Sequence, residues 1–189
     1  SMEAPWSFSA AGAARIRAIN GSVIQKPLAC AGHWLSNYVK DNAQIELIGS
    51  NSYFDYIGAD GLMQINSSEE CDAMILRDGA AYLVGKASSG TGKGVLVASN
   101  ALIGVAKQWN NNVRTDLLQG FGSARIESES TMTVCPLDWG IGNTDWERRV
   151  KFANIPLTGA GDLVVSNGAP TKVFTVTVLN GANTCTGVA

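Results

Sequence analysis

Two turn dipeptides constrain the fold of this chain more than any other feature. Asn20-Gly21 and Asp78-Gly79 each lie between two short runs of apolar or alternating residues. Asn, Asp and Gly tolerate a positive φ, which the two-residue turn of a β-hairpin requires at both central positions. Each dipeptide therefore predicts a hairpin that joins two antiparallel strands.

Further strand candidates follow along the chain, separated by turn-forming residues. The clearest is 172–179, in which successive side chains alternate between two faces. Alternation with a period of two residues places one face against a core and the other toward solvent. The remaining candidates are 44–48, 53–57, 62–65, 73–77, 81–84, 95–98, 124–129, 132–135, 150–155 and 163–166.

Short strands at this spacing predict a mainly β fold. We expect an antiparallel β-sandwich or barrel, a jelly roll included, with at most one or two short helices. The helix candidates are 33–40 and 99–118, and no internal repeat is visible. The weakly patterned segment 1–13 predicts a loose N-terminal arm. Residues 14–189 have a length that suits a single β-rich domain.

The composition favours a protein that works through its surface. Only 16% of the 189 residues are charged, and 21 are glycine, so the polar surface consists mostly of short neutral side chains. Low charge leaves little repulsion between copies, and we expect a homo-oligomer. This composition resembles that of surface proteins and tail fibres of viruses and bacteriophages. The resemblance implies a non-enzymatic structural or attachment domain at a virion or extracellular surface.

Two partner classes are not expected. The net charge is −2, and the basic residues form no stripe of the kind that nucleic-acid binding requires. No apolar run is long enough to insert into a membrane. The N-terminus of the sequence lacks the pattern of a signal peptide.

The loop 138–146 is the best candidate for ligand binding. It carries Asp138, Trp139, Asn143, Asp145 and Trp146 in a glycine-rich setting. Tryptophan rings offer stacking area, and the carboxylate and amide groups offer hydrogen bonds, as a sugar requires. A carbohydrate-binding module, with a glycan or another cell-surface receptor as its partner, is therefore one alternative. Burial of both rings beneath the loop is the competing interpretation.

Catalytic motifs are weak, and the balance favours a protein that is not an enzyme. The glycine-rich segment 87–94 has Ala87 and Gly94 where a phosphate-binding loop needs Gly and Ser or Thr. His33 is the single histidine, and no nucleophile elbow occurs. A carboxylate-dependent hydrolase is the remaining alternative. We predict no cofactor and no metal. We expect Cys30, Cys71, Cys135 and Cys185 to be thiols, with two disulfides among them as the alternative.

Overall fold

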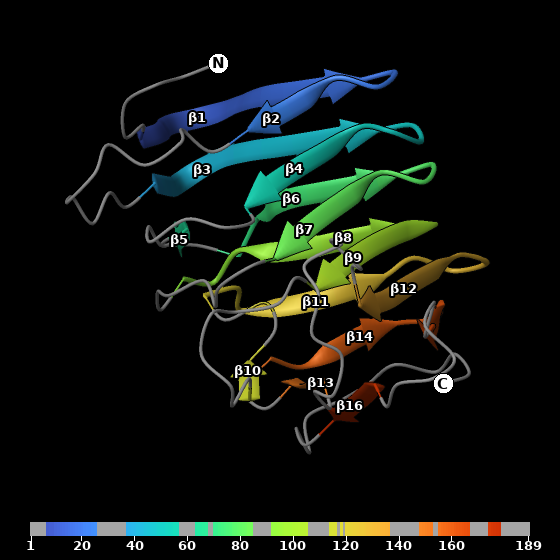
Figure 1. Ribbon diagram of the computed structural model, residues 1–189. Coiled ribbons are helices and arrows are strands. Elements are labelled where there is room, and N and C mark those ends of the chain that lie inside the picture. The colour runs from blue at the N-terminus through green and yellow to red at the C-terminus, as the bar shows by residue number, and fades with distance from the viewer. Residues whose placement is uncertain are drawn as a thin grey trace, which may run out of the picture.

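The computed structural model extends over the whole chain and shows strands connected by short corners and longer segments (Figure 1). The residues that it describes are 7–25, 37–56, 63–67, 70–84, 92–105, 114–116, 118, 120–136, 148–152, 155–166 and 174–178. None of these residues is in a helix.

The described strands form three sheets, here called A, B and C. Sheet A has the order β1 (Ser7–Ile19), β3 (Asn37–Ile48), β6 (Asp72–Arg77), β8 (Val95–Ser99), β11 (Ser123–Ile126) and β14 (Leu157–Gly159), with β5 (Met63–Asn66) also paired to β3. Sheet B has the order β15 (Asp162–Val165), β12 (Thr131–Pro136), β9 (Ala101–Val105), β7 (Ala81–Val84), β4 (Tyr53–Tyr56) and β2 (Val23–Gln25). Sheet C contains β10 (Arg114–Asp116), β13 (Arg148–Phe152) and β16 (Phe174–Val178).

Each pairing between these strands is parallel, and the strand order follows the chain. The chain passes from a strand of sheet A around a corner to a strand of sheet B, and then returns to sheet A one position further along (Figure 1). Repetition of this path produces a parallel β-solenoid. The prediction of an antiparallel β-sandwich or barrel is therefore wrong, although the mainly β class is right.

The error arose at the turns, whose local geometry was predicted correctly. Asn20 and Gly21 have φ of 54° and 87°, and Asp78 and Gly79 have φ of 55° and 86°. The amide of Ser22 donates to the carbonyl of Ile19, as in a hairpin turn. However, β1 pairs with β3 and β2 pairs with β4, so the turn is a corner between two sheets. Local turn chemistry does not specify the strands' partners.

Alternation along the strands was a second source of the error. Parallel sheets usually have both faces covered and therefore read as continuous apolar runs. In the described part of this solenoid the inner faces of sheets A and B meet, and the outer face of sheet A carries charged side chains that are partly exposed. The resulting two-residue period resembles that of an antiparallel sheet with one solvated face.

The core lies between sheets A and B and is built from rows of stacked side chains. One row in sheet A contains Ile45, Met74 and Leu96, and a row in sheet B contains Tyr82 and Ile103; all are fully buried. Each coil adds one side chain to each row, so neighbouring coils bury one another's apolar surface. The described strands therefore depend on their neighbours for a core.

The coils have unequal lengths, which explains why no repeat is visible in the sequence. The row Ala18, Leu47, Leu76, Ala98, Ile126 and Gly159 is set by the strand register. Successive members are 22 residues apart at Leu76 and Ala98 but 33 apart at Ile126 and Gly159. Without a fixed period, self-comparison of the sequence has no signal.

The helix predicted over 99–118 is wrong where the structure describes it. Its first part is the end of β8 followed by β9, and its last part contains β10. Asn100 has φ of 50° and forms the corner between β8 and β9, which interrupts any helix. The other candidate, 33–40, overlaps β3, which begins at Asn37; residues 33–36 lie outside the described residues. Strand β1 starts at Ser7, inside the segment 1–13 where the sequence predicts an arm.

Candidate functional site

The predicted ligand-binding loop lies outside the described residues. This applies to Asp138, Trp139, Asn143, Asp145 and Trp146, and their role remains a prediction. The same is true of His33, Cys30, Cys185 and residues 87–91 of the glycine-rich segment. Among the described parts of the chain, the site with the most concentrated polar chemistry is on the outer face of sheet A.

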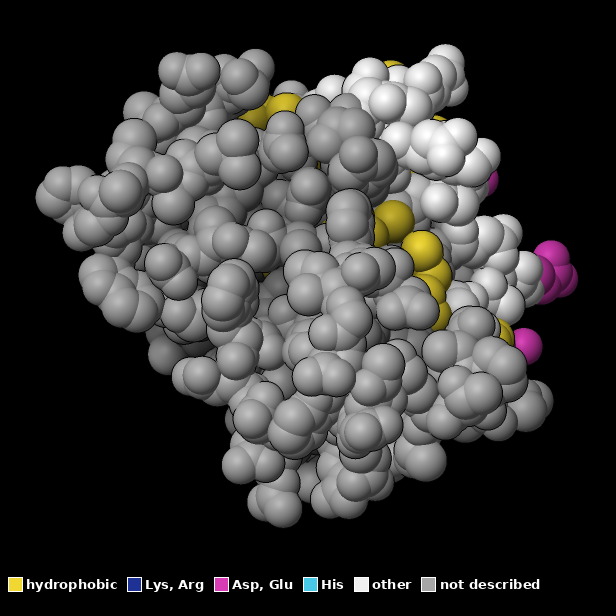
Figure 2. Space-filling view, viewed as in Figure 1, with side chains coloured by type: hydrophobic (Ala, Val, Ile, Leu, Met, Phe, Trp, Pro, Cys, Tyr) yellow, Lys and Arg dark blue, Asp and Glu magenta, His cyan; other side chains and the backbone are white. Residues whose placement is uncertain are grey.

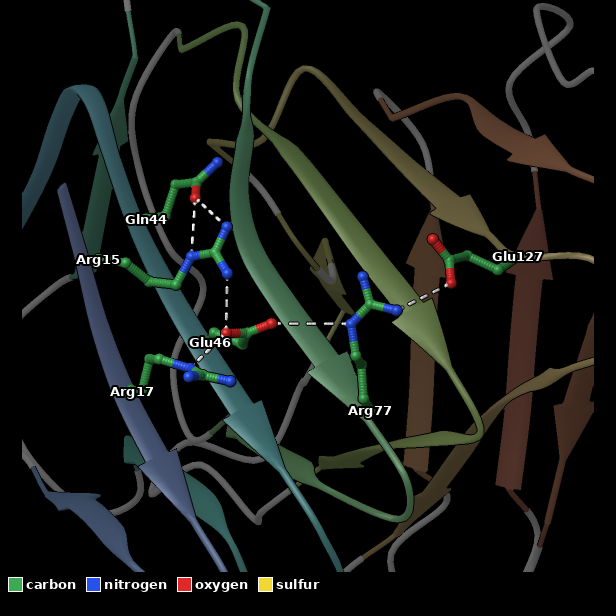
Figure 3. A network of polar contacts seen from close by, with 6 residues as sticks. All are labelled: Arg15, Arg17, Gln44, Glu46, Arg77 and Glu127. Atoms are coloured by element: carbon green, nitrogen blue, oxygen red, sulfur yellow. Dashed lines mark hydrogen bonds and ion pairs between the residues drawn. The ribbon is translucent and has the colours of Figure 1, made fainter. Parts of the chain in front are cut away.

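This site, which we call the arginine cluster, contains six side chains from neighbouring coils (Figure 3). Its members are Arg15 and Arg17 of β1, Gln44 and Glu46 of β3, Arg77 of β6 and Glu127, which follows β11. Alternation places them on the outer face, because the intervening Ile16, Ile45 and Leu76 belong to inward rows.

Glu46 is at the centre of the arginine cluster. Its carboxylate receives Nη1 of Arg15 at 3.0 Å and Nε of Arg17 at 2.7 Å, and Nε of Arg77 is 3.7 Å away. The Glu46 side chain is only 6% exposed, whereas each arginine is 38–50% exposed. The negative charge is therefore buried beneath three positive groups that reach solvent.

Strand register explains why these residues meet. Arg17 lies directly opposite Glu46 in the β1–β3 pairing, and Arg15 lies opposite Gln44. Both Nε and Nη2 of Arg15 donate to Oε1 of Gln44, at 3.0 and 2.8 Å. Directly paired residues in a sheet are close enough for such contacts, and opposite charges there stabilise the pairing.

Two ion pairs pass over β8, a strand that contributes no charge to them. Nη1 of Arg77 on β6 lies 3.3 Å from Oε2 of Glu127, the residue that follows β11 in the sequence. Nη2 of Arg125 on β11 lies 2.9 Å from Oδ1 of Asp72 on β6. Neighbouring strands are about 4.8 Å apart, so each pair spans about 10 Å. Only long side chains such as arginine can bridge that distance.

A small apolar cluster lies on this same face between the two ion pairs. It consists of Ile75, Val95 and Val97, which are separate from the main core but buried. Val97 lies opposite both Ile75 and Arg125 in the register. The alkyl part of Arg125 must cross this row to reach Asp72, so it can cover apolar surface while its charged end is paired.

The arginine cluster is equipped for holding strands together and for presenting positive groups, rather than for covalent chemistry. Its carboxylates are engaged by guanidinium groups, and its members include no hydroxyl, thiol or imidazole. The cluster connects β1, β3, β6 and the corner after β11, which are parts of four different coils. It therefore links segments that are distant in the sequence.

The sequence contains one signal for this site, the spacing of its polar residues, although these residues were not predicted as a site. Arg15 and Arg17 are two residues apart, as are Gln44 and Glu46, so each pair shares a strand face. That spacing identifies two polar half-sites. Joining them requires the β1–β3 register, which the local sequence does not reveal.

The remaining chemical groups are dispersed. The described residues contain no group of three or more His, Cys, Asp or Glu side chains that could hold a metal ion. Cys71 and Cys135 are both thiols, as expected, and burial raises the pKa of the Cys135 thiol. In the part of the chain that the structure describes, no helix is long and apolar enough to cross a membrane.

Comparison with known proteins identifies no relative: no family model, no curated protein and no solved structure matches this chain. The class of the protein, a parallel β-solenoid, therefore rests on its topology alone.

Proposed function

We propose that this chain is a non-enzymatic structural or attachment domain that acts through the surface of a parallel β-solenoid. The observation that carries the proposal is the unbroken strand order of sheets A and B, each with six successive strands in the solenoid. Such sheets hold outward side chains in rows with a spacing of about 4.8 Å. A rigid, regular surface of this kind suits mechanical roles and multivalent contacts.

The character of the surface supports this proposal. The corner residues Asn20, Asn51, Asp78 and Asn100 are short and polar, and the described surface in Figure 2 is mainly neutral with acidic side chains at its margin. On the described part of this face, few long charged side chains need to be ordered when a partner binds, which lowers the entropic cost of contact. The buried side chains beneath it are almost entirely apolar.

Carbohydrate binding is the alternative function, and it rests on residues of the sequence. Trp139 and Trp146 with the neighbouring Asp and Asn residues supply stacking and hydrogen bonding for a glycan. Under this alternative, the solenoid is the scaffold that presents the loop.

One experiment tests both ideas. The protein is applied to a glycan array, and the arrayed glycans are then analysed by mass spectrometry. We expect unchanged glycan masses, because the proposed domain makes and breaks no bonds. Cleavage of any glycan would contradict the proposal and favour a hydrolase.

The loop is tested by the double variant Trp139→Ala, Trp146→Ala on the same array, with circular dichroism as the folding control. Loss of binding with an unchanged spectrum supports a ligand site. Loss of the β spectrum shows instead that the rings are core anchors. A single substitution in the arginine cluster, Gln44→Ala, serves as a matched control that leaves the loop sequence intact.

A further inference from the structure

The large apolar side chains that are exposed in the described part of the chain lie on strands at the two ends of the solenoid. They are Ile19 on β1, at 37% exposed, and Val164 and Val165 on β15, at 38% and 49%. β1 is the first strand of sheet A, and β15 is the last strand of sheet B. Exposed apolar side chains scattered at random over a surface need no explanation, but confinement to both ends does.

The exposure of Val165 is informative because this residue belongs to an inward row. Val165 lies opposite Val134, which in turn lies opposite Ile103. Val134 and Ile103 are fully buried, because each has a coil on both sides. Val165 has the side chain and register of a core residue, but among the described strands none continues the row beyond it.

The other end of the solenoid shows the same feature. Ile16 lies opposite Ile45 in the inward row of sheet A. Ile45 is fully buried, whereas Ile16 is only partly buried. Both ends of the core column therefore expose positions that a further coil would cover.

The backbone at the two ends is also complementary. β1 and β2 pair on one side only, with β3 and β4, and β14 and β15 pair on one side only, with β11 and β12, among the strands that the structure describes. A strand at the edge of a sheet can take on a further strand from another chain through main-chain hydrogen bonds. All four strands have the polarity of their own sheet, so a parallel continuation meets no reversal.

We propose that a second copy of this chain stacks on the solenoid head to tail, with β14 and β15 of one copy pairing with β1 and β2 of the next. Continuing the observed rows places Val165 opposite Ile24 of the next copy, and Leu157 opposite Ile16. Arg17 of the next copy then lies opposite Thr158, a neutral residue. The contact therefore extends apolar rows without opposing like charges.

A symmetric contact between two β1 edges is less favourable. Antiparallel pairing centred on Ile16 would place Arg15 of one copy opposite Arg17 of the other. Like charges directly opposite each other destabilise a sheet. The head-to-tail contact avoids this repulsion. Because such a contact is heterologous and its ends stay open, it builds a filament rather than a closed dimer.

This assembly goes beyond the proposed function, since a surface-acting domain has no need to polymerise. It is tested with two end-blocked variants in sedimentation velocity over a range of concentrations. Ile16→Lys blocks the β1 end, because Ile16 belongs to the inward row that the next copy would cover, and Val164→Lys, Val165→Lys blocks the β15 end. Thr133→Lys is the matched control, because Thr133 precedes Val164 in the same outward row but lies on the internal strand β12.

The wild-type chain and Thr133→Lys should form larger species as concentration rises. Each blocked variant alone should stay monomeric, with the association midpoint raised at least about tenfold, because a buried unpaired ammonium is costly. An equimolar mixture of the two blocked variants should form a dimer that does not grow, since only one compatible pair of ends remains.

Three results would overturn the proposal. The first is a wild-type chain that stays monomeric up to its solubility limit. The second is a blocked variant that dimerises with itself, which indicates a symmetric contact. The third is a mixture that stays monomeric while the wild type assembles. Circular dichroism confirms the fold of each variant, and Ile16→Thr with Val165→Thr repeats the mixing experiment if a lysine variant fails to fold.

Discussion

Arg17 and Glu46 lie directly opposite each other on β1 and β3, with Nε of the guanidinium 2.7 Å from Oε2 of the carboxylate. Arg15 and Arg77 approach the same carboxylate from the two sides of β3, as Figure 3 shows. The nearly buried charge of Glu46 is thus balanced by groups from both neighbouring coils.

Replacing Glu46 with Gln should therefore destabilise the protein. The substitution keeps the side-chain volume but leaves three guanidinium groups close together without their shared anion. We expect a loss of about 2 kcal/mol in the free energy of unfolding, less than for a fully buried pair because the arginines are partly exposed. Urea unfolding followed by circular dichroism measures this loss.

Glu127→Gln provides the matched control, because Arg77 is its single ion-pair partner among the described residues and its side chain is 34% exposed. Its loss should stay below about 1 kcal/mol. Equal losses for the two variants would show that the burial of Glu46 beneath three arginines has no special energetic consequence.

The bridge between Arg125 and Asp72 should act through packing as well as charge. Arg125→Ala removes both the ion pair and the alkyl chain that crosses the row of Ile75 and Val97, whereas Asp72→Asn removes only the charge of the partner. We expect about 1–2 kcal/mol for Arg125→Ala and under about 1 kcal/mol for Asp72→Asn.

A second comparison isolates the packing contribution of Arg125. Arg125→Met retains an apolar chain of similar length and should recover most of the stability that Arg125→Ala loses. If Met is as destabilising as Ala, the alkyl chain has no covering role. Urea midpoints and slopes of the three variants decide the matter.

Gly159 should be among the least replaceable residues of the described chain. It has φ of 96°, and a Cβ atom there would overlap the carbonyl oxygen of Ile126 on the adjacent β11. Gly159→Ala therefore combines an unfavourable backbone conformation with a backbone clash. We expect a loss of at least about 3 kcal/mol in the free energy of unfolding. If the last coil opens alone, the first coils should keep their stability.

Gly21→Ala is the control for backbone conformation without a clash. Gly21 has φ of 87°, but the nearest atom to a Cβ there is Cβ of Asn51, at 3.9 Å. The expected loss is about 1–2 kcal/mol.

Hydrogen exchange measured by mass spectrometry tests the prediction for Gly159→Ala. Exchange should increase in β14 and β15, and protection that is unchanged in these strands would contradict the prediction.

The corner at Asn100 combines two stabilising features that substitutions can separate. Asn100 has φ of 50°, and its Oδ1 accepts a hydrogen bond of 3.1 Å from the amide of Thr131 on the next coil. Asn100→Gly keeps the backbone conformation and loses the hydrogen bond, at a cost of about 1 kcal/mol. Asn100→Ala loses both and should cost about 2–3 kcal/mol.

The order of these two variants is the test at this corner. Thermal unfolding should rank wild type above Asn100→Gly, and Asn100→Gly above Asn100→Ala. A reversed order for Gly and Ala would mean that the left-handed backbone conformation is not required in solution.

Alkaline pH should weaken the fold through Cys135. Burial raises the pKa of this thiol, so the folded state binds more protons than the unfolded state between the two pKa values. Stability is therefore complete below the unfolded pKa and declines as pH rises toward the folded pKa. Urea midpoints of wild type and Cys135→Ala, compared between about pH 7 and about pH 10, should converge as pH rises. A constant difference would contradict the assignment.

The strands and corners could be predicted because they depend on neighbouring residues. The apolar, strand-forming residues of 73–77 and 95–98 and the positive φ of Asn20 and Asp78 follow from side-chain and backbone preferences within a few residues. The low charge of the surface was also readable directly. These features establish a β-rich chain with tight corners. They do not determine which residues far apart in the sequence come into contact.

The partners of the strands were decided only by the tertiary structure. A tight turn such as Asn20-Gly21 serves a hairpin or a corner equally well, and the choice depends on whether β2 buries more apolar surface against β1 or against β4. Glu46 illustrates the consequence for the candidate site: its carboxylate meets arginines from β1 and β6, each 29 to 31 residues away in the sequence. Contacts at that separation arise because coils of unequal length stack on one another. Burial of the shared core sets the register of this stacking, and local preference does not.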